Sequence, residues 1–325
     1  MRKIILTNLI FIFFIIFFLE FIFNFFRLSN LKGIEPGLII TEENIHKMSP
    51  NSSGIHFGEK IFIDNKGFRV PNKNYTYNKK NKGSIFIIGD STTFGNGVIE
   101  EKTFVGQLRK NLADINFYNS SVPGYNVKHF EANIDLIDNF SNIKKVLYFF
   151  TLNDIYSGDS ILDLTKNKKL ENYNHENISI KKNELISKIN AYLNSRSYSY
   201  NFFKGVITDP SKRYFVNIKK SYKNSNLDNI RRYIALLQNK LNEKNIELKI
   251  YVLPYEFQTR NCSNENLIPQ RKINMILNDL NVNYQDFTIN FCEHAKPKTL
   301  FYKFDPMHLS IKGHSLIFNM IKNEI

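Results

Sequence analysis

The chain opens on an almost unbroken apolar stretch behind Arg2 and Lys3. Residues 4–26 are interrupted only by Thr7, Asn8, Glu20 and Asn24. Because about 20 mostly apolar residues cross a bilayer as a helix, this stretch is long enough to span one. A cleaved signal peptide has a shorter apolar region and a small-residue cleavage site, and no such site follows Phe26. We therefore predict a retained N-terminal membrane anchor over residues 1–27; the alternative is a buried hydrophobic helix.

Beyond a polar lead-in over residues 28–83, with a short strand around 60–63, apolar runs alternate with segments of helical spacing. Short apolar runs that end in turn residues are typical of buried strands; they occupy residues 84–88, 115–118, 145–150, 247–253 and 282–284. Helical spacing covers 103–112, 127–140, 229–241, 271–280 and 310–323, the last with Ser310 as N-cap. Such alternation builds a mostly parallel sheet covered on both faces, so we predict an α/β domain over residues 84–325.

Residues 157–226 separate the third predicted strand from the next predicted helix. They are rich in Lys, Asn, Ser and Tyr. A loop of this length is rarely structureless inside a domain, so we interpret it as an insertion near the carboxyl edge of the sheet, with helical structure as one option. It would act there as a lid or a substrate platform; the alternative is a surface insertion without a role.

Composition and charge narrow the class of protein. A hydrophobic fraction of 42% with 29 Phe supplies a sizeable core, and 23% charged residues is not the composition of a disordered tail. The net charge of +14 would suit anionic partners. However, Lys is spread along the whole chain, and no RNP-type, zinc-finger or helix-turn-helix signature occurs. We therefore do not expect nucleic acid as a partner.

The two cysteines, Cys262 and Cys292, have no metal-ligand spacing. They form either one disulfide or two buried thiols. A disulfide closing this loop would stabilise the fold by about 3–4 kcal/mol in the chain-entropy model.

Polar residues with catalytic potential follow the predicted strands. Asp90 and Ser91 come directly after the first strand, Gly124 after the second and Asn153 after the third, while residues 305–308 precede the last helix. In a doubly wound sheet the loops after the strands share one edge, where ligands bind. Segments far apart in the sequence can therefore meet there.

These residue types fit acyl transfer through a serine. A hydroxyl such as that of Ser91 needs a base to remove its proton. His308 is suited to that role, and Asp305 would hold its imidazole and stabilise the imidazolium. The Ser91 and Gly124 backbone N–H groups and the Asn153 side-chain amide are candidate donors to the oxyanion, since glycine allows close approach of the backbone.

These motifs resemble the SGNH (GDSL-like) hydrolase superfamily over residues 84–325. The first block reads Gly-Asp-Ser-Thr-Thr-Phe-Gly at 89–95; the third reads Thr-Leu-Asn-Asp at 151–154, with Thr151 where the family has Gly; the last is Asp305-Pro-Met-His308. The resemblance implies a three-layer α/β/α, flavodoxin-like sheet, an ester substrate that is often an acetyl group on carbohydrate, and no metal or organic cofactor. No G-x-S-x-G or Walker A motif competes with it.

A segment after the fourth strand is similar to membrane-anchored members of the superfamily. It contains Gln258 and Arg260, which either contact a sugar or carboxylate of the substrate or stabilise the loop. Arg69, in a second such segment, is interpreted as structural. Basic residues flank both sides of the predicted anchor and give no orientation. The cysteine usage and the resemblance place the domain outside the cytoplasm.

The leading hypothesis is therefore a membrane-anchored, extracytoplasmic serine esterase or acyltransferase. It would act through an acyl-enzyme on Ser91, with an O-acetylated glycan as the expected substrate. The alternatives are an inactive glycan-binding or scaffold protein on the same fold, and a lipid-directed esterase favoured by the anchor and the positive charge.

Overall fold

Five parallel strands form the central sheet of the computed structural model, which describes residues 2–42, 45–80, 82–126, 129, 136–140, 142–155 and 184–325. The strands are β6 (Gly83–Gly89), β7 (Ile115–Asn119), β8 (Ile143–Phe150), β9 (Glu247–Val252) and β10 (Asn283–Asp286). Their order is β10-β9-β8-β6-β7, with every pair parallel. Numbered within this sheet the order is 2-1-3-4-5, the flavodoxin-like arrangement. The predicted fold class is confirmed.

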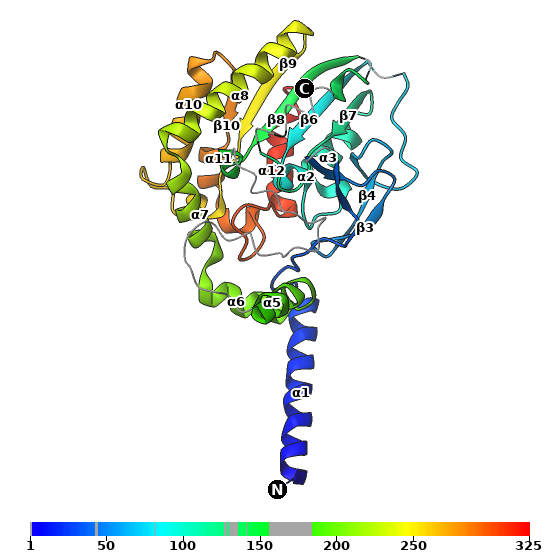
Figure 1. Cartoon of the computed structure of the whole chain (residues 1–325), viewed down its shortest axis with the longest axis vertical. Helices are drawn as coiled ribbons and strands as arrows, with labels where there is room; N and C mark the ends of the chain where they lie inside the picture. Colours follow the sequence, from blue (N-terminus) through cyan, green and yellow to red (C-terminus); the bar gives the residue numbers. More distant parts are fainter. Residues whose placement is uncertain are drawn as a thin grey trace.

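Helices cover both faces of the sheet (Figure 1). Alternate residues of a strand point to opposite faces, so Phe86 and Ile88 of β6 join one core cluster and Ile85 and Ile87 join the other. The first cluster contains the apolar sides of α8 (Asn224–Glu243) and α10 (Ile268–Asp279). The second contains those of α3 (Phe104–Asn111) and α12 (Ile311–Ile321).

The predicted lead-in is more regular than its polar sequence suggests. Its strands are β1 (Ile39–Glu42) paired with β2 (Ile45–Met48), and a second antiparallel sheet of β3 (Ser53–His56), β4 (Glu59–Ile63) and β5 (Arg69–Val70). Inward-facing residues of these strands, among them Met48 and Ile61, belong to the first core cluster. The lead-in therefore packs on the domain.

The described part of the predicted insertion is helical. Its helices are α5 (Glu184–Arg196), α6 (Tyr198–Thr208) and α7 (Pro210–Ser221). Asp209 separates α6 from α7 and accepts a hydrogen bond from the Lys212 backbone, with Pro210 starting the next helix. Residues 156–183, and most of the helix predicted over 127–140, lie outside the described residues.

Short elements complete the described chain. They are α2 (Ser91–Phe94), η1 (Glu100–Lys102), η2 (Leu152–Ile155), α9 (Glu256–Arg260), α11 (Thr288–Cys292) and η3 (Pro297–Leu300). Cys262, just beyond α9, and Cys292 form a disulfide, which decides between the two alternatives left open by the sequence.

Helix α1 (Arg2–Phe25) projects from the rest of the molecule (Figure 1). Residues Ile4–Phe25 have a mean hydropathy of 2.6, and none of the most apolar stretch is buried. This helix is long and apolar enough to cross a membrane, and a signal sequence has the same properties.

Candidate active site

Ser91 begins α2, directly after strand β6. The short helix is capped by the Asp90 carboxylate, which accepts a hydrogen bond of 2.8 Å from the Thr92 backbone N–H. Gly89 permits the tight turn, because a Cβ there would lie 2.2 Å from the Thr93 hydroxyl oxygen. Gly95 ends the helix with φ of +86°, a conformation that favours glycine. The strand-to-helix turn thus places the Ser91 hydroxyl at the carboxyl edge of the sheet.

His308 and Asp305 meet Ser91 at this edge. His308 Nε2 lies 2.9 Å from Ser91 Oγ, and His308 Nδ1 lies 2.9 Å from Asp305 Oδ2. The other carboxylate oxygen of Asp305 accepts hydrogen bonds from the backbone N–H groups of Met307 and His308. All three proposed triad side chains are buried. A continuous hydrogen-bonded series therefore joins a carboxylate, an imidazole and a hydroxyl.

The environment of Asp305 favours its ionised form. Burial alone would raise its pKa, but the interaction with His308 and the nearby Lys32 outweigh burial and hold the pKa of Asp305 well below its usual range. Lys32 Nζ is 3.9 Å from the carboxylate. The carboxylate is therefore charged at neutral pH and oriented toward the imidazole.

Asn153, in the turn η2 after β8, presents its side-chain nitrogen toward the Ser91 loop. Its amide oxygen accepts hydrogen bonds from the hydroxyls of Thr151, at 2.6 Å, and Tyr255, at 2.8 Å. The amide nitrogen donates to Asp90 over 3.1 Å. An amide nitrogen carries two hydrogens, and this one bond uses one of them. The Thr151 hydroxyl joins the network that orients the amide.

Gly124 lies in the loop that follows β7. Hydrogen bonds tie this loop to the end of β6: the Ser120 hydroxyl donates to the Ile87 carbonyl over 2.9 Å, and the Val122 N–H donates to the Gly89 carbonyl over 3.3 Å. Gly124 has φ of +87°, which favours glycine here as well. The loop is thereby held beside the turn that carries Ser91.

Three side chains that the sequence did not single out contact the Asp305–His308 pair. Besides Lys32, the Phe57 ring packs edge-on against the His308 imidazole with centroids 5.3 Å apart. Asn96 Nδ2 lies 3.2 Å from His308 Nε2. Asn96 directly follows the first motif, so its position in the sequence could have marked it as a residue of the site. Lys32 and Phe57 come from the lead-in, and no local pattern marks them.

Arg69, interpreted from the sequence as structural, supports the loop after α2. Its guanidinium is fully buried and donates to the backbone carbonyls of Phe94, Gly95 and Val98. This arrangement fixes the loop that carries Asn96.

Gln258, one of the two predicted substrate contacts, lies in the interior. Its amide oxygen accepts from the Tyr255 backbone and from Gln270, each over 2.9 Å. Its amide nitrogen donates to the Asn266 carbonyl over 2.8 Å and to Gln270 over 2.5 Å. These are the contacts expected of a residue that stabilises the loop.

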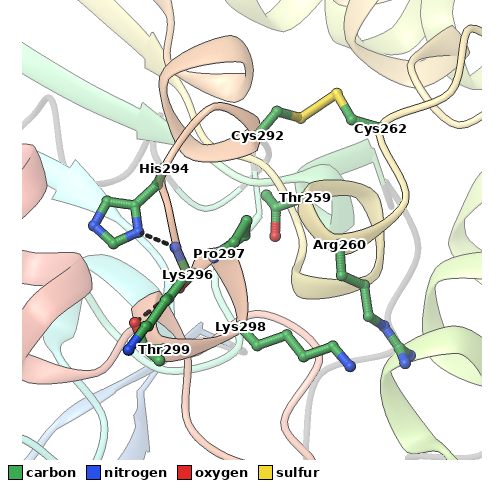
Figure 2. Close-up of a pocket in the computed structure, with 9 residues that line it drawn as sticks. All are labelled: Thr259, Arg260, Cys262, Cys292, His294, Lys296, Pro297, Lys298 and Thr299. Carbon is green, nitrogen blue, oxygen red and sulfur yellow. Dashed lines mark hydrogen bonds between the residues drawn. A yellow bond between two sulfur atoms is a disulfide. The ribbon is translucent and has the colours of Figure 1, made fainter.

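Arg260, the other predicted contact, forms ion pairs with Asp209 at 2.6 Å and Glu256 at 3.2 Å. It lines an open pocket of about 640 Å³ beside the disulfide, together with Lys296 and Lys298 (Figure 2). The triad side chains are not among the residues that line this pocket. The structure thus places Arg260 at a hollow that the triad side chains do not line.

The described residues contain no evident cluster of metal ligands. Within those ranges, no group of three or more His, Cys, Asp or Glu side chains is arranged to hold an ion. The site is assembled from side chains and backbone N–H groups.

Comparison with known proteins gives matches at the level of structure. No protein-family model matches the chain, and no curated protein matches it in sequence. Solved structures similar to it include a member of the lipolytic G-D-S-L family from Veillonella parvula, at 12% identity and a TM-score of 0.40, with 74% of this chain and 96% of that chain covered.

Two further structures show the same level of similarity. The psychrotrophic esterase EstA from Pseudoalteromonas has 14% identity and a TM-score of 0.43, with 74% of this chain and 96% of that chain covered. A mutant of the acetyl-xylooligosaccharide esterase Axe2 from Geobacillus has 15% identity and a TM-score of 0.44, with 75% and 94% covered. Because the identities are low, the chemistry of this chain is inferred from its own side chains.

Proposed function

We propose that this chain is a serine ester hydrolase or acyltransferase that works through an acyl-enzyme on Ser91. The observation that carries the proposal is the hydrogen-bonded series from Asp305 through His308 to Ser91, with 2.9 Å at each step. A hydroxyl held against an imidazole, which is held in turn against a charged carboxylate, is the arrangement that activates serine as a nucleophile.

In the proposed reaction, Ser91 Oγ attacks the carbonyl carbon of the ester while His308 Nε2 takes the hydroxyl proton. Asp305 keeps the other ring nitrogen in place and stabilises the imidazolium. The oxyanion is met by the Ser91 and Gly124 backbone N–H groups and by the second hydrogen of the Asn153 amide. The imidazolium then returns its proton to the departing alcohol, and the acyl group stays on Ser91.

The acyl-enzyme is resolved by an attacking hydroxyl. Water would release a free acid, and a sugar hydroxyl would accept the acyl group, in both cases with His308 as the base. The substrate that we propose is an O-acyl group, in the first place O-acetyl, on a glycan outside the cytoplasm. The resemblance of the motifs to the SGNH superfamily supports this choice.

We propose that the protein is anchored in a membrane by α1 and that its α/β domain lies outside the cytoplasm. The exposed apolar helix α1 supports the anchor. The disulfide between Cys262 and Cys292 supports the extracytoplasmic side, because disulfides persist in oxidising compartments.

An assay with p-nitrophenyl acetate, with and without an acceptor sugar, tests this function. We expect wild-type protein to release p-nitrophenol and to be labelled by a fluorophosphonate probe. Ser91→Ala should abolish labelling and lower kcat/KM by at least about 10³-fold. A rate increase with acylated sugar as product would indicate transfer. Equal rates for wild type and Ser91→Ala would remove Ser91 as the nucleophile, and an unlabelled wild type would favour the glycan-binding scaffold.

A lipid-directed esterase is the second candidate. Apolar side chains such as Phe203, Val206 and Ile207 are exposed on α6, and this helix packs against the residue that precedes Asp305. This candidate predicts a preference for long-chain esters and a higher rate on vesicles than on soluble esters. Short acetyl esters of sugars would be preferred under the leading proposal.

A further inference from the structure

Helices α5 and α6 lie across the end of α1, between that helix and the α/β domain (Figure 1). We infer that these two helices, here called the interfacial pair, rest in the headgroup region of the bilayer that α1 crosses, with their exposed apolar side chains among the lipids. The inference rests on the proposed membrane anchor and adds a second contact with the same bilayer.

The first observation is an exposed apolar stripe on each helix of the pair. On α6, Phe203, Val206 and Ile207 have exposed fractions of 48%, 57% and 82%. Their spacing of three and four residues places them on one side of the helix. On α5, Ile186, Ile189 and Tyr192 are also exposed. In the described part of the chain, these stripes face solvent.

The stripe on α6 points away from the α/β domain. Gly205 faces the domain, because a Cβ at that position would lie 2.2 Å from the Phe304 ring. Successive helical residues are about 100° apart, so Ile207 and Phe203, each two residues from Gly205, lie on the opposite side. The apolar surface of α6 is therefore turned toward the side on which α1 leaves the domain.

The depth of the pair along α1 is set by Glu20. Its carboxylate accepts hydrogen bonds from the Tyr198 N–H at 2.6 Å and the Ser199 N–H at 3.1 Å, and from the hydroxyls of Ser197 and Ser199. Glu20 lies five residues before Phe25, the last residue of α1. At a rise of 1.5 Å per residue, the start of α6 lies about 7–8 Å from the C-terminal end of α1, beside the apolar part of that helix.

This junction explains how a charged residue, Glu20, is accommodated in the apolar segment. A carboxylate within a membrane span is unfavourable unless it is paired, and the N-terminus of a helix is a favourable partner for it. The contact is extended by Phe23, whose ring lies 4.8 Å from that of Phe202 and 5.5 Å from that of Phe203. The pair is thus joined to α1 within its apolar length.

Tyrosines with basic partners surround the junction. Tyrosine rings are enriched at both membrane–water interfaces, and long Lys and Arg side chains near the ends of a membrane span extend their charged groups to the interface. The pairs are Arg27 over Tyr198 at 5.5 Å, Arg196 over Tyr192 at 4.7 Å and Lys204 over Tyr200 at 5.6 Å. This chemistry fits a lipid surface, since the α6 stripe adjoins α1 through the contact of Phe203 with Phe23.

The interfacial pair also contacts the catalytic loop. Phe304, which packs on Gly205, directly precedes Asp305, and its ring lies 5.4 Å from that of Phe202. The Asn194 carbonyl of α5 accepts a hydrogen bond from the Lys32 N–H, and Lys32 Nζ reaches the Asp305 carboxylate. A bilayer contact at α5 and α6 would therefore hold the edge with Ser91 near the membrane surface.

Single tryptophans test the inference directly, because the chain contains no Trp. Full-length Ile207→Trp, Phe13→Trp and Met275→Trp proteins would be reconstituted in vesicles of phosphatidylcholine and phosphatidylglycerol, with lipids brominated at shallow or deep acyl positions. Phe13 is exposed near the middle of α1, and Met275 is exposed on α10, far from α1 (Figure 1). Ile189→Trp provides a second reporter on α5.

We expect deep bromines to quench the Phe13→Trp protein, shallow bromines to quench the Ile207→Trp and Ile189→Trp proteins, and neither to quench Met275→Trp. Quenching of Phe13→Trp with unquenched emission from both reporters of the pair would overturn the inference and leave the anchor intact. Absence of quenching at Phe13 would instead reject the anchor. Equal quenching of Met275→Trp would show unspecific adsorption and would also reject the inference.

Discussion

Two buried side-chain amides follow neighbouring strands at the same edge of the sheet, and they use their hydrogen-bonding groups differently. An amide has two hydrogens and two oxygen lone pairs. Gln258, after β9, bonds through all four of these to Tyr255, Asn266 and Gln270. Asn153, after β8, uses both lone pairs but donates one bond, to Asp90. We propose that the second hydrogen of Asn153 is donated to the oxyanion of the substrate.

The same difference separates Arg260 from His308. Arg260 is neutralised by two carboxylates, Asp209 and Glu256, whereas His308 Nε2 faces the Ser91 hydroxyl, whose proton we propose that it accepts. In the sequence, Arg260 and His308 both looked suitable as site residues, because both are polar and both were expected at the carboxyl edge of the sheet. What distinguishes them is their partners: in one case the protein already satisfies the side chain, and in the other a hydrogen-bonding group is left for the proposed substrate.

The largest effect is expected from Asp305→Asn. The substitution keeps the shape of the loop but removes the charge that stabilises the imidazolium and sets the tautomer of His308, so kcat should fall about 10⁴-fold. Steady-state kinetics on p-nitrophenyl acetate would measure this. A loss below tenfold with an intact fold would show that Asp305 is not part of the catalytic series.

The acid stability of the same variant is a control for the charge. The pKa of Asp305 is lowered in the folded state, so its ionisation stabilises the fold above the unfolded-state pKa of about 3.9 and this contribution is lost as the pH falls through the lower, folded value. Wild type should therefore lose more unfolding free energy than Asp305→Asn on acidification below about pH 4. Parallel urea titrations at each pH would show a constant difference if the carboxylate were not favoured in its charged form.

Asn153→Ala is expected to lower kcat by about 10²–10³-fold, because it removes one donor to the oxyanion. The effect should fall on kcat more than on KM, since the oxyanion exists in the transition state. Unchanged kcat would place Asn153 with Gln258 among the structural amides.

Gln258→Leu is the matched amide control for that variant. It removes a buried group and leaves its partners Asn266 and Gln270 short of hydrogen bonds, which typically costs about 1–3 kcal/mol of unfolding free energy. We expect kcat and KM of the folded fraction to stay at the wild-type values. A raised KM with unchanged stability would instead support the substrate contact suggested by the sequence.

Arg260→Gln should have the smallest effect. Its ion pairs are partly exposed to solvent, and such pairs contribute about 0–1 kcal/mol. We expect little change in the melting temperature or in KM. A several-fold rise in KM for an acylated sugar, without a similar rise for p-nitrophenyl acetate, would assign the Arg260 pocket to substrate binding.

Local periodicity was sufficient to predict the sheet and most of its helices. The run at 84–88 became β6, and Ser310 caps α12 as expected. Residues 103–112 contain α3, with Thr103 as its cap. These elements are encoded by the spacing of apolar residues and by caps within a few positions, so a short window contains the information. The motifs that follow the strands then indicated which residues share an edge.

Contacts between distant segments could not be predicted from local sequence patterns. Lys32 and Phe57 reach the Asp305–His308 pair from a lead-in whose sequence reads as polar, and Glu20 meets the start of α6 across more than half of the chain. No spacing rule links such positions, because they are brought together by packing of whole elements.

Covalent order along the chain specified the strands, the helices and the motifs that carry the proposed catalytic residues, since each depends on neighbours a few positions away. Packing in three dimensions determined which polar groups have protein partners. Gln258 is fully hydrogen-bonded and Arg260 is paired with carboxylates. The imidazole of His308 lies against the Ser91 hydroxyl. The reason is that a hydrogen bond depends on distance in space, and sequence separation does not constrain that distance until the fold has formed.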